Sequence, residues 1–318
     1  MVRGSHQLAG ADVGGCCTLS ISHEGRSEWQ FIAAVATKCF GIGQTSASGL
    51  GAFANRDIQC GERILAEDPL LQWTMGDMET TTDENPDTLL ALFNALSPVD
   101  RATYSGLYHD PMHGAVRSVY GVWLSNSYPV GTGQEAQDAD SWRARAIFAD
   151  ASRFNHACSP NAHMSWNPRI GKRTIHALQP IAKGVELTVS YLTNASGMLR
   201  DDRCEQLGFS CVCVPCMTRG VARTNSDRRR SRIGVLFGML QSALDGKDAR
   251  TLALVKERLA LLEEEGDGAS WDTMHVALAY CISVNKVKAA KRWAARAAKS
   301  ALRGLGSDSE EYVAWSKF

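Results

Sequence analysis

The chain has 318 residues, of which 44% are hydrophobic and 21% charged, a composition typical of a folded globular protein with room for two domains. Its 34 basic and 34 acidic residues cancel, so no global field attracts nucleic acid or an anionic membrane, and we expect neither as a direct partner. No apolar run reaches the roughly 20 residues that span a bilayer, and the first residues lack the apolar block of a secretory signal.

These exclusions predict a reducing compartment, the nucleus and/or the cytoplasm. Cysteines in such compartments serve more often as metal ligands or core residues than in disulfides. The ten cysteines of this chain therefore become candidates for a metal site.

The first two thirds of the chain alternate between strand and helix patterns. Residues 1–45 are poorly readable, with one weak apolar stretch, WQFIAAVATKCF, that is compatible with a strand. Residues 48–71 are punctuated by glycines, which predicts two short strands. A helical insert follows at about 76–145, and short apolar runs return after it, ending in GVELTVSYL, whose alternation is that of a strand. A β region thus surrounds a helical insertion.

Beyond about residue 218 the period changes to that of helices. The segment RTNSDRRRSR is interpreted as a charged linker, with a nuclear targeting signal or phosphate contact as the alternative. Four apolar-spaced segments then predict an all-helical C-terminal domain over 218–318. Its short connections, DGKDAR and EGDGAS, favour antiparallel helix pairs.

Three cysteines cluster in FSCVCVPC, at Cys211, Cys213 and Cys216. A structural zinc site needs four ligands in a tetrahedron, with sulfur at about 2.3 Å from the metal. The fourth ligand is missing locally. Cys158, within NHACSP, is the first candidate, and Cys204 or a histidine is the alternative.

The segment GLGAFA at 49–54 fits the dinucleotide pattern G-x-G-x-x-A. That fingerprint requires a helix to open at the glycines, whereas the sequence continues as a strand and a turn. We therefore reject a dinucleotide site. What remains of the signal is that glycines allow a ligand to approach the backbone closely.

Four motifs in order resemble the SET-domain protein lysine methyltransferase family: GLGAFANRDIQCGERILAEDPLL, RFNHACSPN, GVELTVSY and FSCVCVPC. The match covers roughly residues 46–217. The helical C-terminal domain makes the chain most similar to the branch that includes the SET and MYND proteins and their fungal relatives. It departs from that branch because no cysteine lies between Leu71 and Arg145, so the MYND finger and its contacts are absent.

The resemblance implies an α+β fold: a SET domain at 46–192 with a pseudoknot, a zinc-bound post-SET segment at 193–217, and the helical domain. It also implies S-adenosylmethionine and zinc as cofactors. Backbone at Gly49, Leu50 and Gly51 would contact the cofactor, with Asn155, His156 and Phe209. Tyr191 falls at the family's catalytic tyrosine, which also lies against the cofactor. The implied zinc ligands are Cys158, Cys211, Cys213 and Cys216.

The implied activity is methyl transfer to a lysine of a protein, a histone or another, by an enzyme that we expect to be a monomer. Transfer from a sulfonium is an in-line displacement, so positioning and electrostatics are the protein's main tasks. The alternative is a SET-like protein used for small-molecule chemistry or as a binding scaffold. Leu207 favours the alternative, because relatives often have an aromatic residue there that walls the lysine channel.

Overall fold

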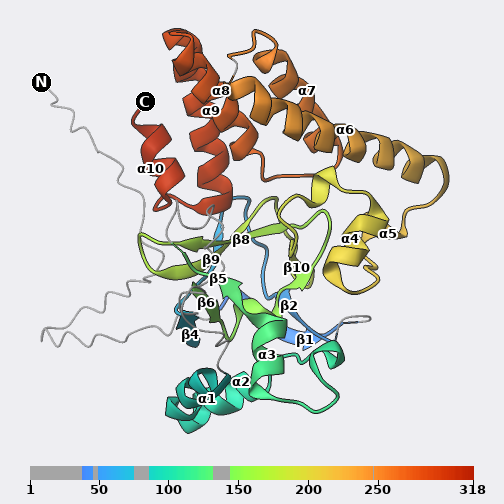
Figure 1. Ribbon diagram of the computed structural model, residues 1–318, viewed down its shortest axis with the longest axis vertical. Helices are drawn as coiled ribbons and strands as arrows, with labels where there is room; N and C mark the ends of the chain where they lie inside the picture. Colours follow the sequence, from blue (N-terminus) through green and yellow to red (C-terminus); the bar gives the residue numbers. More distant parts are fainter. Residues whose placement is uncertain (1–37, 46–48, 75–85, 132–143, 246) are drawn as a thin grey trace, which may run out of the picture. The chain divides into compact units, whose positions relative to one another are not determined.

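The computed structural model describes residues 38–45, 49–74, 86–131, 144–245 and 247–318. All strands within these ranges lie before residue 190, and the chain after residue 198 forms helices (Figure 1). The predicted α+β class is confirmed.

The strands form three small sheets rather than one large sheet. The first has the order β1-β2-β10-β7, the second β3-β9-β8 and the third β4-β6-β5. Their bounds are β1 Phe40–Gln44, β2 Leu50–Ala54, β3 Arg63–Glu67, β4 Leu71–Thr74, β5 Tyr128–Pro129, β6 Ala144–Ile147, β7 Asn155–His156, β8 Ala162–Asn167, β9 Lys172–Ala177 and β10 Glu186–Val189. The two strands predicted within 48–71 are thus β2 and β3, and the strand predicted in GVELTVSYL is β10.

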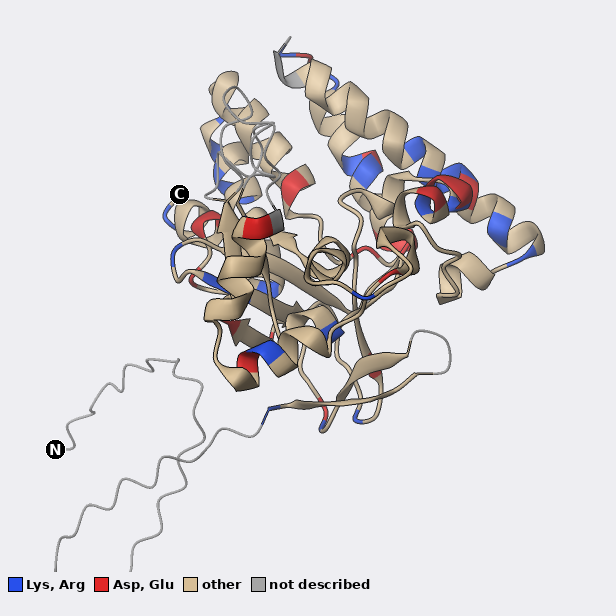
Figure 2. Ribbon diagram, turned by 60° about the horizontal axis from the view of Figure 1, so that its bottom comes forward, with Lys and Arg blue, Asp and Glu red and all other residues tan. Residues whose placement is uncertain are grey.

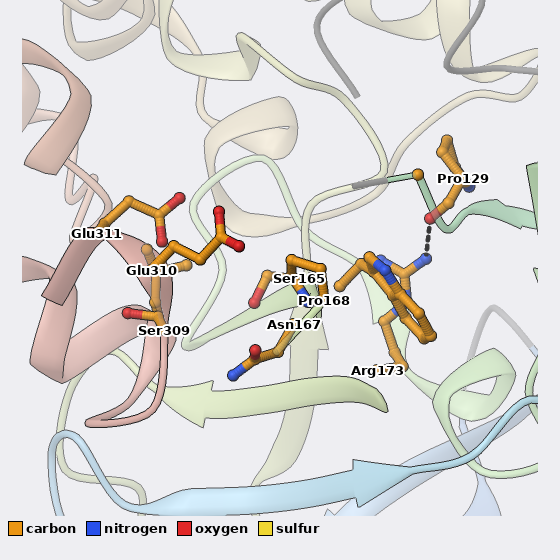
Figure 3. Close-up of a pocket in the computed structure, with 11 residues that line it drawn as sticks. Pro129, Ser165, Asn167, Pro168, Arg173, Ser309, Glu310 and Glu311 are labelled. Atoms are coloured by element: carbon orange, nitrogen blue, oxygen red, sulfur yellow. Dashed lines mark hydrogen bonds between the residues drawn. The ribbon is translucent and has the colours of Figure 1, made fainter. Parts of the chain in front are cut away.

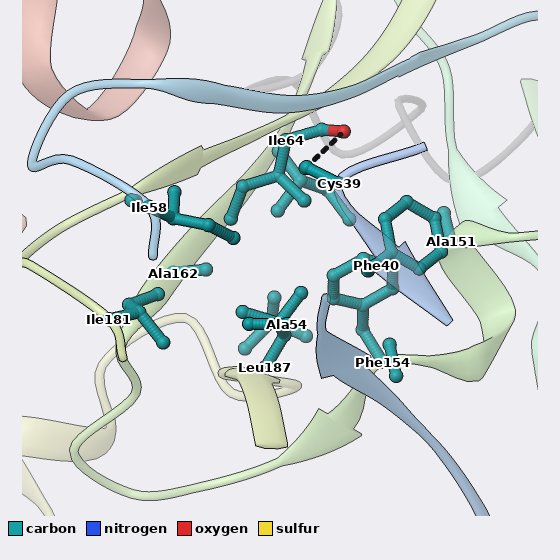
Figure 4. Packing of buried hydrophobic residues seen from close by; sticks show 14 of the residues in the cluster. Cys39, Phe40, Ala54, Ile58, Ile64, Ala151, Phe154, Ala162, Ile181 and Leu187 are labelled. Carbon is teal, nitrogen blue, oxygen red and sulfur yellow. Dashed lines mark hydrogen bonds between the residues drawn. The ribbon is translucent and has the colours of Figure 1, made fainter. Parts of the chain in front are cut away.

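One hydrophobic core holds the first two sheets together. Figure 4 shows it, with Phe40 of β1 and Phe154 before β7 in edge-to-face contact at 5.2 Å between ring centroids. Ile58, Ile181 and Leu187 are almost fully buried beside them. Such packing sets the β-sheet frame on which the loops between strands are carried.

The described part of the predicted helical insert contains three α-helices and packs on the third sheet. Its helices are α1 Pro86–Ala95, α2 Pro98–Ser105 and α3 Val119–Asn126, with a short 3-10 turn at Pro111–His113. Ser97 caps α2 by accepting a hydrogen bond from the Asp100 backbone N–H, as an N-cap serine does. Trp73 of β4 meets Trp123 of α3 edge to face at 5.6 Å. The parts of the insert at 75–85 and 132–143 lie outside the described residues.

The remaining helices form the last third of the chain. Two short 3-10 turns lie at Ala151–Arg153 and Ala195–Gly197, and the helices are α4 Arg200–Leu207, α5 Val214–Met217, α6 Gly220–Asp245, α7 Thr251–Glu264, α8 Trp271–Ser283, α9 Val287–Leu305 and α10 Glu310–Ser316. A second core packs between α6, α7, α8 and α9, with Leu236, Val255, Ala277 and Ala294 among its most buried members. The helical domain predicted from the apolar spacing has this packing.

The interpretation of RTNSDRRRSR as a linker is wrong. The segment lies inside α6, and its arginines are used in ion pairs: Arg223 with Asp227, Arg229 and Arg230 with Glu265, and Arg232 with Glu257. In Figure 2 basic and acidic residues lie together at this long helix. Acidic residues in and just after α7 compensate the positive charge of these arginines. The segment therefore forms part of a helix and is not a solvated linker.

Residues 39–318 form one compact unit. Helix α9 contacts strands β8 and β9, so the helices after residue 218 pack directly on the β region. The domain boundaries at residues 192 and 217 therefore stay a prediction drawn from the sequence. Within the described part of the chain, every helix is too short or too polar to traverse a lipid bilayer.

Candidate active site and metal centre

The site is organised by two short parallel strands that are distant in the sequence. Strand β7 pairs with β10, with Asn155 opposite Thr188 and His156 opposite Val189. The Asn161 side chain then ties the loop after β7 to β10: its Nδ2 donates to the Glu186 carbonyl at 2.8 Å, and its Oδ1 accepts from the Thr188 N–H at 2.8 Å. The NHACSPN loop therefore lies directly beside the strand that leads to Tyr191, as the resemblance implied.

Asn155 lies beside Leu50 and Gly51 of β2. Its Nδ2 donates to the Leu50 carbonyl at 3.2 Å and to Glu186 Oε1 at 2.7 Å. A Cβ at Gly51 would lie 2.8 Å from Asn155 Nδ2 and 2.6 Å from Glu186 Oε1. A side chain at this position would therefore displace the Asn155 and Glu186 side chains. The predicted residues Leu50, Gly51 and Asn155 thus lie together, and Gly49 precedes them with a φ of 76°.

His156 connects this strand pair to Tyr191 and to the cysteines. Its Nδ1 accepts a hydrogen bond from the Tyr191 backbone N–H at 3.0 Å, so the ring proton must lie on Nε2. Nε2 is 3.3 Å from Cys158 Sγ, within reach of a donation to sulfur. Burial lowers the pKa of His156 to about 4, so the ring is neutral. Phe209 approaches its edge, with ring centroids 6.4 Å apart.

The Tyr191 hydroxyl is directed into the fold although the residue is 43% exposed. It donates to the Phe154 carbonyl at 2.8 Å. Burial raises its pKa well above the ordinary value, and the nearby Tyr128 and Glu186 raise it further. The hydroxyl therefore remains a neutral phenol at physiological pH and cannot serve as a general base. Tyr128 of β5 is a residue that sequence reasoning did not single out.

Four cysteines come together from two distant segments. The sulfurs of Cys158, Cys211, Cys213 and Cys216 all lie within 4.8 Å of one another. Cys158 Sγ is 3.9 Å from Cys211 Sγ and 3.5 Å from Cys216 Sγ, whereas a zinc tetrahedron with bonds of about 2.3 Å places sulfurs about 3.8 Å apart. The spacing is too long for disulfides. The donor set and its geometry fit a zinc ion.

This arrangement bears on the fourth metal ligand, which stays a prediction. Cys158 is the fourth member of the cluster, while Cys204 only packs against it. His156 contacts the sulfur of Cys158 but is not one of the four members of the cluster. Leu207 also packs against the cysteines. The sequence indicated a role for it only as a residue of the substrate channel.

Sequence reasoning missed a buried arginine at the cysteines. Arg203 of α4 is 1% exposed, and its Nε and Nη2 lie 3.1 Å from Cys158 Sγ and 3.3 Å from Cys216 Sγ. Four thiolates around a divalent ion carry a net charge of about −2, and a buried guanidinium offsets part of it. No local pattern in RDDRCEQL signals this role, because the cysteines are reached only through the tertiary fold.

A second network joins the same loop to the C-terminal helices. Arg230 of α6 is 1% exposed and pairs with Glu265 at 2.8 Å, and its Nη2 lies 3.4 Å from Ser159 Oγ. Ser159 Oγ in turn donates to the Glu265 carbonyl at 2.8 Å. The residue next to Cys158 is therefore held by the Arg230 side chain and the Glu265 backbone carbonyl, both more than 70 positions later.

A hollow of about 290 Å³ lies between strands β5, β8 and β9 and the start of α10; Figure 3 shows the residues that line it. Arg173 lies on one side of it, donating to the Pro129 carbonyl at 2.8 Å, with its guanidinium over the Tyr128 ring at 5.0 Å. Glu310 and Glu311 lie on the opposite side. One wall of the hollow is therefore cationic and the opposite wall is acidic. Pro129, the residue that follows Tyr128, belongs to the lining.

The rejection of a dinucleotide site agrees with the structure, because GLGAFA is strand β2, paired with β1 and β10 and not followed by a helix.

Comparison with known proteins adds the family. Residues 49–192 match the family model described as SET domain. The chain is 26% identical over 282 residues to the protein named Histone-lysine N-methyltransferase set5 of Schizosaccharomyces pombe, covering 85% of this chain and 80% of that protein. It is 33% identical over 76 residues to Histone-lysine N-methyltransferase ASHR1 of Arabidopsis thaliana, covering 23% of this chain and 15% of that protein.

Solved structures give weaker likenesses. A Plasmodium falciparum protein described as a histone methyltransferase is 17% identical, with a TM-score of 0.24 over 49% of this chain and 95% of the other. The Neurospora SET domain protein DIM-5, described as a histone lysine methyltransferase, is 17% identical, with a TM-score of 0.27 over 48% of this chain and 52% of the other.

Proposed function

This chain carries a SET domain over residues 49–192, and on that premise we propose that it is an S-adenosylmethionine-dependent methyltransferase acting on a lysine side chain of a protein. The observation that carries the proposal is the convergence of Asn155, His156 and Tyr191 on the paired strands β7 and β10. The names of the two curated relatives support a histone as the substrate and the nucleus as the place of action. The comparisons do not support the small-molecule or scaffold alternative.

The residues present fit the cofactor. Gly51 leaves no space for a side chain beside Asn155, as expected where a ligand lies against backbone. Asn155 uses its Nδ2 within the protein, which leaves its Oδ1 to accept from the amino group of a methionine moiety. Phe209 is 46% exposed beside His156 and offers a face to an adenine ring. S-adenosylmethionine supplies an electrophilic methyl group when it is bound.

The chain's own residues then position the reaction. Because the Tyr191 phenol stays neutral and donates its proton to the Phe154 carbonyl, its oxygen lone pairs are available to orient a methyl group through weak C–H···O contacts. The target amine must arrive unprotonated, and partial desolvation near a positive sulfonium lowers the pKa of a lysine. Tyr191 therefore acts by orientation, and transfer needs no protein base.

We place the polypeptide flanking the target lysine at the hollow shown in Figure 3. Glu310 and Glu311 have no ion pair with any described residue, so a basic side chain of the substrate would complement them. The opposite wall, Arg173, has one donor without a partner, Nε, which suits a backbone carbonyl. Peptides with arginine beside the lysine should therefore be better substrates than peptides with glutamate there.

The test begins with calorimetry of S-adenosylmethionine binding to the zinc-loaded chain. We expect Asn155→Ala to weaken binding at least about tenfold, through the loss of a hydrogen bond to a charged group. Tyr191→Phe should keep binding and lower the rate of methyl transfer to a peptide pool. Tyr104→Phe is the matched control, since it removes the same kind of O–H···O=C bond, to Val119 at 2.8 Å, away from the site.

The outcomes separate clearly. Absence of S-adenosylmethionine binding to the unaltered, folded chain would rule out the enzymatic function. Binding together with transfer that Tyr191→Phe and Tyr104→Phe lower equally would show that the Tyr191 hydroxyl has no special role. If the double variant Glu310→Gln, Glu311→Gln keeps the same peptide preference, the substrate does not bind at the hollow. The rest of the proposal would be unaffected.

A further inference from the structure

Helix α9 carries a concentration of positive charge that the methyl-transfer site does not use. Its residues Val287–Leu305 include six basic side chains and no acidic one. Among the described residues, none of the six takes part in an ion pair, whereas four arginines of α6 do. Like charges three and four residues apart destabilise a helix, so an uncompensated set calls for an external partner.

Part of this charge lines a hollow of about 690 Å³, within the range of small-molecule sites. The walls come from the turn between β2 and β3, from α8 and from α9. The lining residues are Cys60, Gly61, Met274, Arg296, Lys299, Ser300, Leu302 and Arg303. Three of them are cationic and none is acidic, and none belongs to the predicted cofactor, zinc or catalytic residues.

Two polar atoms of the lining lack a partner inside the protein. Ser300 is only 5% exposed, and its Oγ has no hydrogen bond. Arg303 donates through Nη2 to the Gly268 carbonyl, but its buried Nε has no acceptor. A guanidinium nitrogen can only donate, and an unpaired buried donor is costly. Arg296 and Lys299, which line the same hollow, are exposed.

We propose that this hollow binds a phosphomonoester carried on a small organic body, a function beyond methyl transfer. A phosphate dianion matches three cationic side chains in one lining better than a single carboxylate does, and guanidinium groups bind phosphate through paired hydrogen bonds. Met274 and Leu302 provide apolar surface for the organic part. The lining has no aromatic side chain on which bases would stack, which favours a small molecule over a nucleic-acid strand.

The test uses the full chain with phenyl phosphate and inorganic phosphate as probes. Calorimetry at physiological salt should give one saturable site that binds phenyl phosphate about tenfold more tightly than inorganic phosphate, because the ring buries apolar surface. Cys60 reports whether the probe binds in this hollow, because it is an exposed free thiol in the lining. Phenyl phosphate should slow its alkylation by iodoacetamide, followed by mass spectrometry.

Variants locate the charge. Lys299→Gln should weaken phenyl phosphate about tenfold and Ser300→Ala about threefold, the scale of a lost charged and a lost neutral hydrogen bond. Lys291→Gln, on the same helix but outside the lining, should change nothing. Equal effects of Lys299→Gln and Lys291→Gln, no protection of Cys60, or no saturable binding would each overturn the proposal. So would tighter binding of duplex DNA that is insensitive to Ser300→Ala, which would indicate a backbone-binding surface.

Discussion

At the scale of single residues, the fold places several histidines and arginines where burial decides their chemistry. His176 of β9 is 1% exposed; its Nε2 accepts from Arg63 Nε at 3.1 Å, and its Nδ1 has no partner. Burial is the main cause that lowers its pKa to about 3. The ring is therefore neutral in the folded chain, and protonation would place a second positive charge against Arg63.

This predicts a loss of stability in acid. The pKa of His176 in the folded chain lies below the value of about 6.5 in an unfolded chain, so its contribution is complete above pH 6.5 and is lost as the pH falls toward 3. Between pH 7 and pH 5 the loss is about 2 kcal/mol. Urea unfolding of the unaltered chain and of His176→Gln measures it: every other ionisable group is present in both proteins, so the difference belongs to His176. Parallel pH profiles would contradict the assignment.

At the scale of secondary-structure elements, α6 is the clearest case of an ion-pair network that makes a polar segment helical. Arg230 and Glu265 are both nearly inaccessible, at 1% and 4% of their side-chain surface. Glu265 also accepts from Arg229 at 2.5 Å and from Ser226 at 2.7 Å. By contrast, Arg232 and Glu257 join the same two helices through a pair that is more than two fifths exposed. The two ion pairs should therefore contribute very differently to the free energy of unfolding.

Glu265→Gln should lower the free energy of unfolding by about 3 kcal/mol, because it leaves a buried arginine charge without its partner. Glu257→Gln, its matched control, should leave the urea midpoint unchanged, since water solvates both ends of that pair. Because Ser159 is bound to the same network, Glu265→Gln should also weaken zinc retention at Cys158. Equal midpoints for the two variants would show that the network contributes no stability.

At the scale of the whole molecule, the cysteine cluster joins the β region to the segment that follows it. Cys158 lies in the loop after β7, and the other three cysteines lie in and beside α5. Two buried arginines, Arg203 and Arg230, hold this junction from α4 and α6. The main β core around Phe40 and Leu187 does not include the cysteines, so its stability should not depend on a metal.

Metal removal tests this division. A strong chelator should release zinc, make residues 193–217 sensitive to proteolysis, and abolish S-adenosylmethionine binding through Phe209, while far-UV circular dichroism changes little. The reason is that zinc binding contributes folding free energy only to the segment that it cross-links. Zinc analysis, limited proteolysis and calorimetry on one preparation give the three readings. Cooperative unfolding of the entire chain would mean that the metal supports the β core as well.

Local patterns in the sequence predicted β2, β3, β10 and the C-terminal helices, and they singled out most residues of the candidate site. The alternation in ELTVS, the glycines of GLGAFA and the spacing of FSCVCVPC depend on neighbouring residues, and physical rules of strand pleating, backbone freedom and metal coordination apply to them directly. The apolar period after residue 230 likewise predicted helices. The zinc ion and S-adenosylmethionine stay predictions, because their residues are brought together without either group.

Only the tertiary structure decided the partners. It selected Cys158 over Cys204, buried Arg203 against two sulfurs, brought Tyr128 close to Tyr191, and turned RTNSDRRRSR into part of a helix by setting Glu257 and Glu265 beside it. Each of these depends on residues tens of positions apart, whose proximity follows from how strands and helices pack. A sequence pattern records the chemistry that each segment can offer, whereas packing determines which segments meet.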